Sequence, residues 1–143
     1  MARGDVTVFD EAKAYMIDGG WEAADDIKCA VLDDTVTPAA GDTTPALGDY
    51  TEVGTGGTYA AGGVSLGNLG TCVAEAAGTM TFDSGTNPTW AQDASNDVDA
   101  HWGLIHHVTS GQGIAFVDLG GPVDMSAGAL TITWNASGIF TIA

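Results

Sequence analysis

Short β-prone segments separated by turn sequences divide the second half of the chain, and they restrict the folds that it can adopt. TCVAEA and TMTFDS flank Ala77–Gly78 and predict a hairpin. Residues 97–108 and 113–121 flank TSGQ and predict a second hairpin, while ALTITW (129–134) and IFTIA (139–143) flank NASG and predict a third. Closely spaced strands joined by Gly and Asx turns are typical of an antiparallel β-sandwich or barrel.

The segment before the last turn indicates which of its faces is buried. Leu130, Ile132 and Trp134 alternate with Thr131 and Thr133. Because successive side chains of a strand point to opposite faces, the three apolar residues share one side. We expect that side to lie in the core.

One helix is predicted, in TVFDEAKAYMIDGG (7–20). Thr7 is placed to cap its start, and Gly19–Gly20 is placed to end it. Asp10 and Glu11 lie near the positive end of the helix dipole. The face predicted to be buried carries Phe9, Ala12 and Met16.

With 143 residues, the chain is long enough for one buried core. We predict a single domain over residues 1–143, with an N-terminal arm and helix over 1–20 and a β domain over 25–143. Residues 25–34 predict a mostly apolar strand, and the turn-rich residues 35–70 predict short strands at most. The predicted fold class is mainly β, an antiparallel β-sandwich or barrel with one short N-terminal α-helix.

Acidic residues dominate the charge. Asp and Glu number 19 against 3 Lys and Arg, for a formal net charge of −16. The three cations, Arg3, Lys13 and Lys28, all lie near the N-terminus, so nothing later in the chain can neutralise phosphate groups. We expect neither nucleic acid nor an anionic membrane as a partner. A basic protein surface or divalent cations would be attracted, and solubility alone is the other explanation of the charge.

The cysteines and the N-terminal stretch indicate the cellular compartment in which the protein folds. Cys29 and Cys72 leave the question of a single disulfide open, and two cysteines do not make a disulfide framework. Cys29 lies in the strand-like IKCAVL, which favours a buried thiol. The stretch MARGDVTVFDEAKAY lacks the apolar core of a signal peptide, so we expect a cytoplasmic origin.

The histidines His101, His106 and His107 all lie in DAHWGLIHH (99–107), which raises the question of a metal site. On a strand, His106 and His107 point to opposite faces. His101 and His107 share a face, but at about 3.3 Å per residue they lie about 20 Å apart, whereas zinc ligands sit about 2 Å from one ion. We therefore interpret the segment as a structural strand and predict no metal site. The half-buried face of that strand carries Trp102, Leu104, His106 and Val108.

Two further patterns resemble catalytic or metal-binding motifs. GVSLG (63–67) matches the G-x-S-x-G pattern around a nucleophilic Ser65, but that chemistry needs a strand-to-helix turn and no helical pattern follows. DASNDVDAH carries oxygen ligands of the kind calcium prefers, but it lacks the spacing, glycine and final glutamate of an EF-hand. Asx turns are the favoured explanation of its Asp and Asn residues, which are Asp93, Asn96, Asp97 and Asp99.

Three short or scattered features suggest surface recognition. RGD (3–5) and the sequon NAS (135–137) matter only in a secreted protein, and we discount both. Tryptophans can stack on sugars, although core packing is their commoner role. The four tryptophans are Trp21, Trp90, Trp102 and Trp134.

Three stretches, in order and covering most of the chain, carry a family resemblance: VTVFDEAKAYMIDG, then DDIKCAVLDDTVTPAAGDTTPALGDYTEVGTGGTYAAGGVSL, then IAFVDLGGPVDMSAGALTITWNASGIFTIA. Together they resemble a family of small virion proteins of tailed bacteriophages. The most specific signature is the ending, DLGG followed by ITWNASGIFT. Some members of the family resemble capsid decoration, or cement, proteins.

The resemblance implies a non-enzymatic structural role without cofactors or catalytic residues. The expected partners are the major capsid protein and copies of this chain, with trimers as the expected arrangement. The expected location is the outer capsid surface, after assembly in the bacterial host cytoplasm. A tail structural component is one alternative, and a carbohydrate- or cation-binding β-sandwich module is another.

Overall fold

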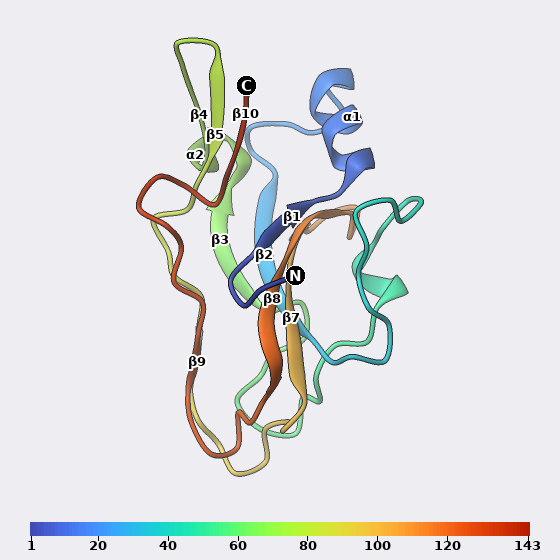
Figure 1. Cartoon of the computed structure of the whole chain (residues 1–143), viewed down its shortest axis with the longest axis vertical. Coiled ribbons are helices and arrows are strands. Elements are labelled where there is room, and N and C mark those ends of the chain that lie inside the picture. Colours follow the sequence, from blue (N-terminus) through green and yellow to red (C-terminus); the bar gives the residue numbers. More distant parts are fainter.

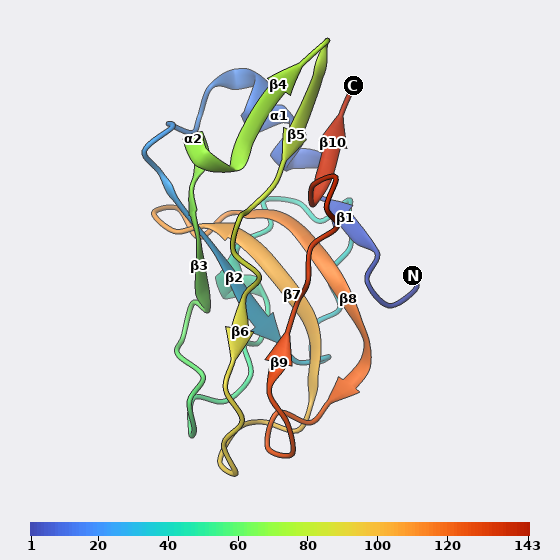
Figure 2. The same cartoon turned by 90° about the vertical axis from the view of Figure 1, so that its left-hand side faces the viewer.

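A computed structural model describes residues 1–143 as two layers of antiparallel strands (Figures 1 and 2). The main sheet has five strands in the order β1-β8-β7-β2-β3. Their bounds are β1 (Val6–Val8), β2 (Asp26–Leu32), β3 (Val64–Asn68), β7 (Ala100–His107) and β8 (Gly113–Val123). The predicted class, mainly β and antiparallel, is confirmed.

The second layer consists of two small sheets that lie in front of the main sheet in Figure 2. A three-stranded sheet has the order β10-β5-β4, and a two-stranded sheet joins β6 to β9. Their bounds are β4 (Val73–Ala76), β5 (Thr79–Phe82), β6 (Thr89–Trp90), β9 (Leu130–Thr131) and β10 (Phe140–Ile142). The helical elements are α1 (Asp10–Asp18), the single turn α2 (Leu69–Cys72) and a 3-10 turn, Leu47–Asp49. None of the helices has the length and apolar character needed to cross a lipid bilayer.

The helix α1 is present as predicted, but the predicted start, with Thr7 as its cap, is wrong. Thr7 lies in β1, and Phe9 occupies the N-cap position without a side-chain cap. Phe9 is fully buried, so packing rather than capping sets where the helix begins. The C-terminal end is as predicted, since Gly19 adopts a left-handed conformation with φ of 69°.

Two of the three predicted hairpins are present, β4–β5 and β7–β8, and the third is wrong. β9 pairs with β6, with Thr131 opposite Thr89, whereas β10 pairs with β5, with Phe140 opposite Phe82. NASG does turn the chain, but that turn leads from one small sheet to the other. Leu130 and Ile132 are buried as expected, and Trp134 is half-buried. Alternation predicts which face is buried but not which strand will be the neighbour.

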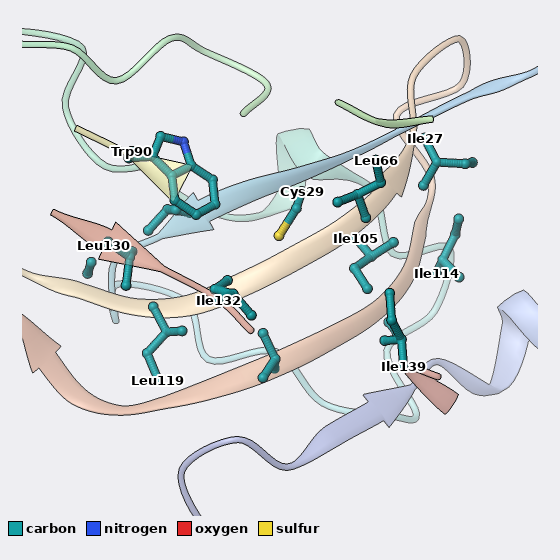
Figure 3. Close-up of a cluster of buried hydrophobic side chains, with 14 of the residues drawn as sticks. Ile27, Cys29, Leu66, Trp90, Ile105, Ile114, Leu119, Leu130, Ile132 and Ile139 are labelled. Atoms are coloured by element: carbon teal, nitrogen blue, oxygen red, sulfur yellow. The ribbon is translucent and has the colours of Figure 1, made fainter. Parts of the chain in front are cut away.

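The core lies on both faces of the main sheet. The larger cluster fills the space between the two layers, where Ile105, Cys29 and Leu119 face Leu130, Ile132 and Trp90 (Figure 3). The smaller cluster lies on the opposite face, beneath α1. It consists of Phe9, Ala12, Leu32, Tyr50, Leu104 and Phe116. The central strands are therefore buried on both faces, which explains their nearly continuous apolar sequences.

We expect Phe82→Ala to lower the free energy of unfolding by about 3–5 kcal/mol, because Phe82 is fully buried in β5 between β4 and β10. Phe140→Ala is the matched control: its ring stacks on Phe82 at 4.8 Å, but it is only partly buried. Urea unfolding should show a smaller loss for Phe140→Ala. Equal losses would contradict this description of the second layer.

Candidate interaction surface

The histidines of β7 have separate structural contacts. His106 and His107 are both buried and point to opposite faces. Nε2 of His106 lies 3.0 Å from the carbonyl oxygen of Gly62, whereas Nδ1 has no partner. Because the ring is desolvated, burial lowers the pKa of His106. This histidine is therefore kept neutral by the fold.

His107 links three parts of the chain. The backbone N–H of Ser110 donates to Nδ1 at 3.1 Å, and Nε2 lies 2.9 Å from Oδ2 of Asp25. Trp21 stacks on the imidazole with ring centroids 5.9 Å apart. This arrangement holds the β7–β8 turn against the segment before β2. The third histidine, His101, lies 3.6 Å from a carboxylate oxygen of Asp99 and 3.8 Å from one of Asp34.

Ser65 lies on the exposed side of β3, and its Oγ accepts a hydrogen bond from the N–H of Gly67 at 3.2 Å. One helical turn, α2, follows β3, contrary to the sequence-based expectation. This turn does not bring a base to Ser65, because the three histidines make their contacts elsewhere.

The acidic segment 93–99 connects loops. Asn96 is buried, and its side chain accepts a hydrogen bond from the N–H of Thr58 and donates one to the carbonyl oxygen of Ala91. Asp97 accepts from the N–H of Gly54 at 2.9 Å, and this hydrogen bond is the main reason that the pKa of Asp97 is lowered. Asp93 accepts from the N–H of Ser95 in an Asx turn. The Asp97 carboxylate and the Asn96 amide thus hold the 54–58 loop against this segment.

The remaining candidates are also engaged in local structure. Cys29 and Cys72 are free, buried thiols, and burial raises the pKa of each. Asn135 of NAS closes a turn by accepting from the N–H of Ser137. The tryptophans do not form one platform: Trp90 is buried, whereas the indole N–H groups of Trp102 and Trp134 donate to Asp34 and Thr86 respectively.

The second layer forms a surface that is nearly free of charge. We call it the neutral layer and define it as residues 73–92 and 125–143, which include β4, β5, β6, β9 and β10. Only Glu75 and Asp83 carry charged side chains within it. Its exposed side carries threonines, among them Thr141 and the pair Thr89 and Thr131, whose hydroxyl oxygens are 3.0 Å apart. In a chain of net charge −16, such a layer is the surface least repelled by an acidic neighbour.

Eight of the 19 acidic residues lie on the opposite side of the molecule. There α1 and the 33–52 segment cover the main sheet, across from β4, β5 and β9 in Figure 1. These elements carry Asp10, Glu11, Asp18, Asp33, Asp34, Asp42, Asp49 and Glu52. The molecule therefore has an acidic side and a neutral side. Residues 84–92 and 125–143 are two runs without charge, and only the strand pairing shows that they share one layer.

One of the two seams between the layers is open. On the β3 side, the hydroxyl of Ser84 donates to the carbonyl oxygen of Leu66 at 2.8 Å, and the N–H of Asp83 donates to Cys72 at 2.7 Å. On the β1 side, a groove of about 700 Å³ remains between β1–β8 and the 130–140 segment. Core residues such as Leu119 and Ile132 line it. We call this groove and its bordering strands the open seam.

Comparison with protein-family models, with curated proteins and with solved structures finds no match to this chain.

We expect the free energy of unfolding to decrease as the pH is lowered from 6.5, the ordinary pKa of histidine, to the lowered pKa of His106 in the folded protein. In that window the unfolded chain binds a proton at this position that the folded chain does not bind, so stability rises with pH. His106→Gln keeps a donor for Gly62 and does not titrate. The difference in unfolding free energy between wild type and variant should shrink as the pH falls through this window. A difference that is independent of pH would contradict the buried neutral ring.

Proposed function

We propose that this chain is a non-enzymatic structural protein of a tailed-bacteriophage virion, attached to the outside of the capsid as a decoration protein. The observation that carries the proposal is the division into a neutral side and an acidic side, together with the family resemblance of the sequence. The interior of a filled capsid holds a polyanionic genome, which would repel a chain of net charge −16. An acidic protein is therefore suited to the exterior.

The neutral layer is the proposed attachment surface. Burying it against the shell leaves α1 and the 33–52 segment facing solvent, so few carboxylates lose their hydration on binding. A decoration protein stabilises a shell by contacting two neighbouring capsomers at once, so that pulling them apart must also break its contacts. Many symmetry-related copies multiply that effect over the particle.

The proposal predicts that purified protein will bind particles that lack it and will raise the temperature at which they release DNA. Occupancy is measured by electron microscopy, and DNA release by a dye that fluoresces on DNA. Binding to tails alone would favour the tail alternative. Binding to the capsid without a rise in release temperature would contradict reinforcement.

A charge placed in the neutral layer tests the attachment surface. Thr141→Glu should lower occupancy, because it buries a carboxylate in the proposed contact. Thr43→Glu adds the same charge to an exposed position on the acidic side and is the matched control. We expect at least a tenfold weaker affinity for Thr141→Glu alone, equivalent to about 1.4 kcal/mol. Equal binding by the two variants would exclude the neutral layer as the attachment surface.

A further inference from the structure

Gly62 is held in place through both of its backbone groups, and each of its partners is a titratable side chain. Its N–H donates to Oε2 of Glu52 at 2.7 Å, and its carbonyl oxygen lies 3.0 Å from Nε2 of His106. The hydroxyl of Tyr59 donates to the same oxygen of Glu52 at 2.6 Å. We call residues 60–63 the latch. The contacts that hold the latch are of a kind that a change of protonation can weaken.

The surroundings of His106 do not accommodate a second proton on its ring. The residue is only 3% exposed, and Nδ1 has no hydrogen-bond partner. Of the nearby charged groups, Glu52 favours the protonated ring, whereas Lys28, which lies opposite His106 on β2, opposes it. On the other side, Gly113 of β8 brings no charge. Protonation would bury a positive charge and leave an N–H at Nδ1 without an acceptor.

The latch can move without disturbing the core. Ala60 and Ala61 are exposed, and the N–H of Gly63 donates to the carbonyl oxygen of Ala60 at 3.0 Å, which closes a turn. Gly62 and Gly63 have φ values of 82° and 75°, which favour glycine. On one side of the latch Tyr59 is buried, and on the other β3 begins, an edge strand that pairs only with β2. Opening the turn therefore exposes no apolar core side chain.

We propose that residues 60–63 form an acid-released latch, which opens when His106 is protonated and thereby loosens the start of β3. Opening lets water reach the charged ring and gives its Nδ1–H an acceptor, so the protonated form favours the open state. The central strands stay in place, because they are buried on both faces. The latch makes one edge of the main sheet sensitive to acid, and it does not depend on what the neutral layer binds.

Amide hydrogen exchange, followed by NMR on the full chain over a pH series, tests the proposal. We expect the opening constant of the Gly62 amide, corrected for the intrinsic pH dependence of exchange, to be independent of pH above 6.5. Below pH 6.5 it should rise about tenfold per pH unit until the lowered pKa of His106 is reached, because the open form binds one more proton than the closed form.

Thr58 provides an internal reference in the same loop. Its N–H donates at 2.8 Å to the side-chain oxygen of Asn96, which does not titrate. The Thr58 amide should therefore open less often than the Gly62 amide at every pH in the series. This comparison needs no variant, so it stands even if a substitution prevents folding.

Two variants identify the group that takes up the proton. His106→Gln keeps a donor for Gly62 and cannot be protonated, so its opening constant should not change with pH. Glu52→Gln keeps an acceptor for the Gly62 N–H and should retain the rise. The proposal is overturned if the wild type shows no rise, or if Gly62 and Thr58 open with the same constant. It is equally overturned if the rise persists in His106→Gln or is lost in Glu52→Gln.

Discussion

The burial of three adjacent strands on both faces is the constraint on which the rest of the structure depends. β2, β7 and β8 alternate between two cores, so that Leu104 packs beneath α1 while its neighbour Ile105 packs against the second layer. A sheet of this kind needs a cover on each side. The two covers need not be alike, and here they differ in charge. The requirement for two covers does not fix their charge, and the division into acidic and neutral sides comes from the different residues with which each cover meets it.

The sequence predicted the elements better than their arrangement. Period-two alternation correctly predicted that Leu130 and Ile132 are buried. The glycines after α1 correctly predicted where the helix ends. Pairing between distant segments was beyond local reasoning, because β6–β9 and β5–β10 depend on which apolar faces meet in space. Thr7 failed as a cap for a similar reason: the burial of Phe9 outweighs a local hydrogen bond.

The candidate sites were only partly predictable. Strand geometry was sufficient to separate His106 from His107, but it did not predict that His107 joins Asp25, Trp21 and Ser110. Asx-turn chemistry predicted the role of Asp93, yet the burial of Asn96 among loop carbonyls required the fold. The open seam was not visible in the sequence, since a groove exists only where two layers fail to meet.

The β4–β5 hairpin extends beyond the body of the molecule in both views (Figures 1 and 2). At its tip Ala77 has a φ of 52°, a left-handed conformation that alanine adopts at a cost, and both Ala77 and Gly78 are exposed. No core side chain depends on that turn, so its length is free to vary. Insertions at exposed loop tips are generally well tolerated. The hairpin can therefore change length without disturbing the core, but β4 and β5 belong to the neutral layer, so a foreign peptide grafted at this tip would stand between the protein and any surface that the layer contacts.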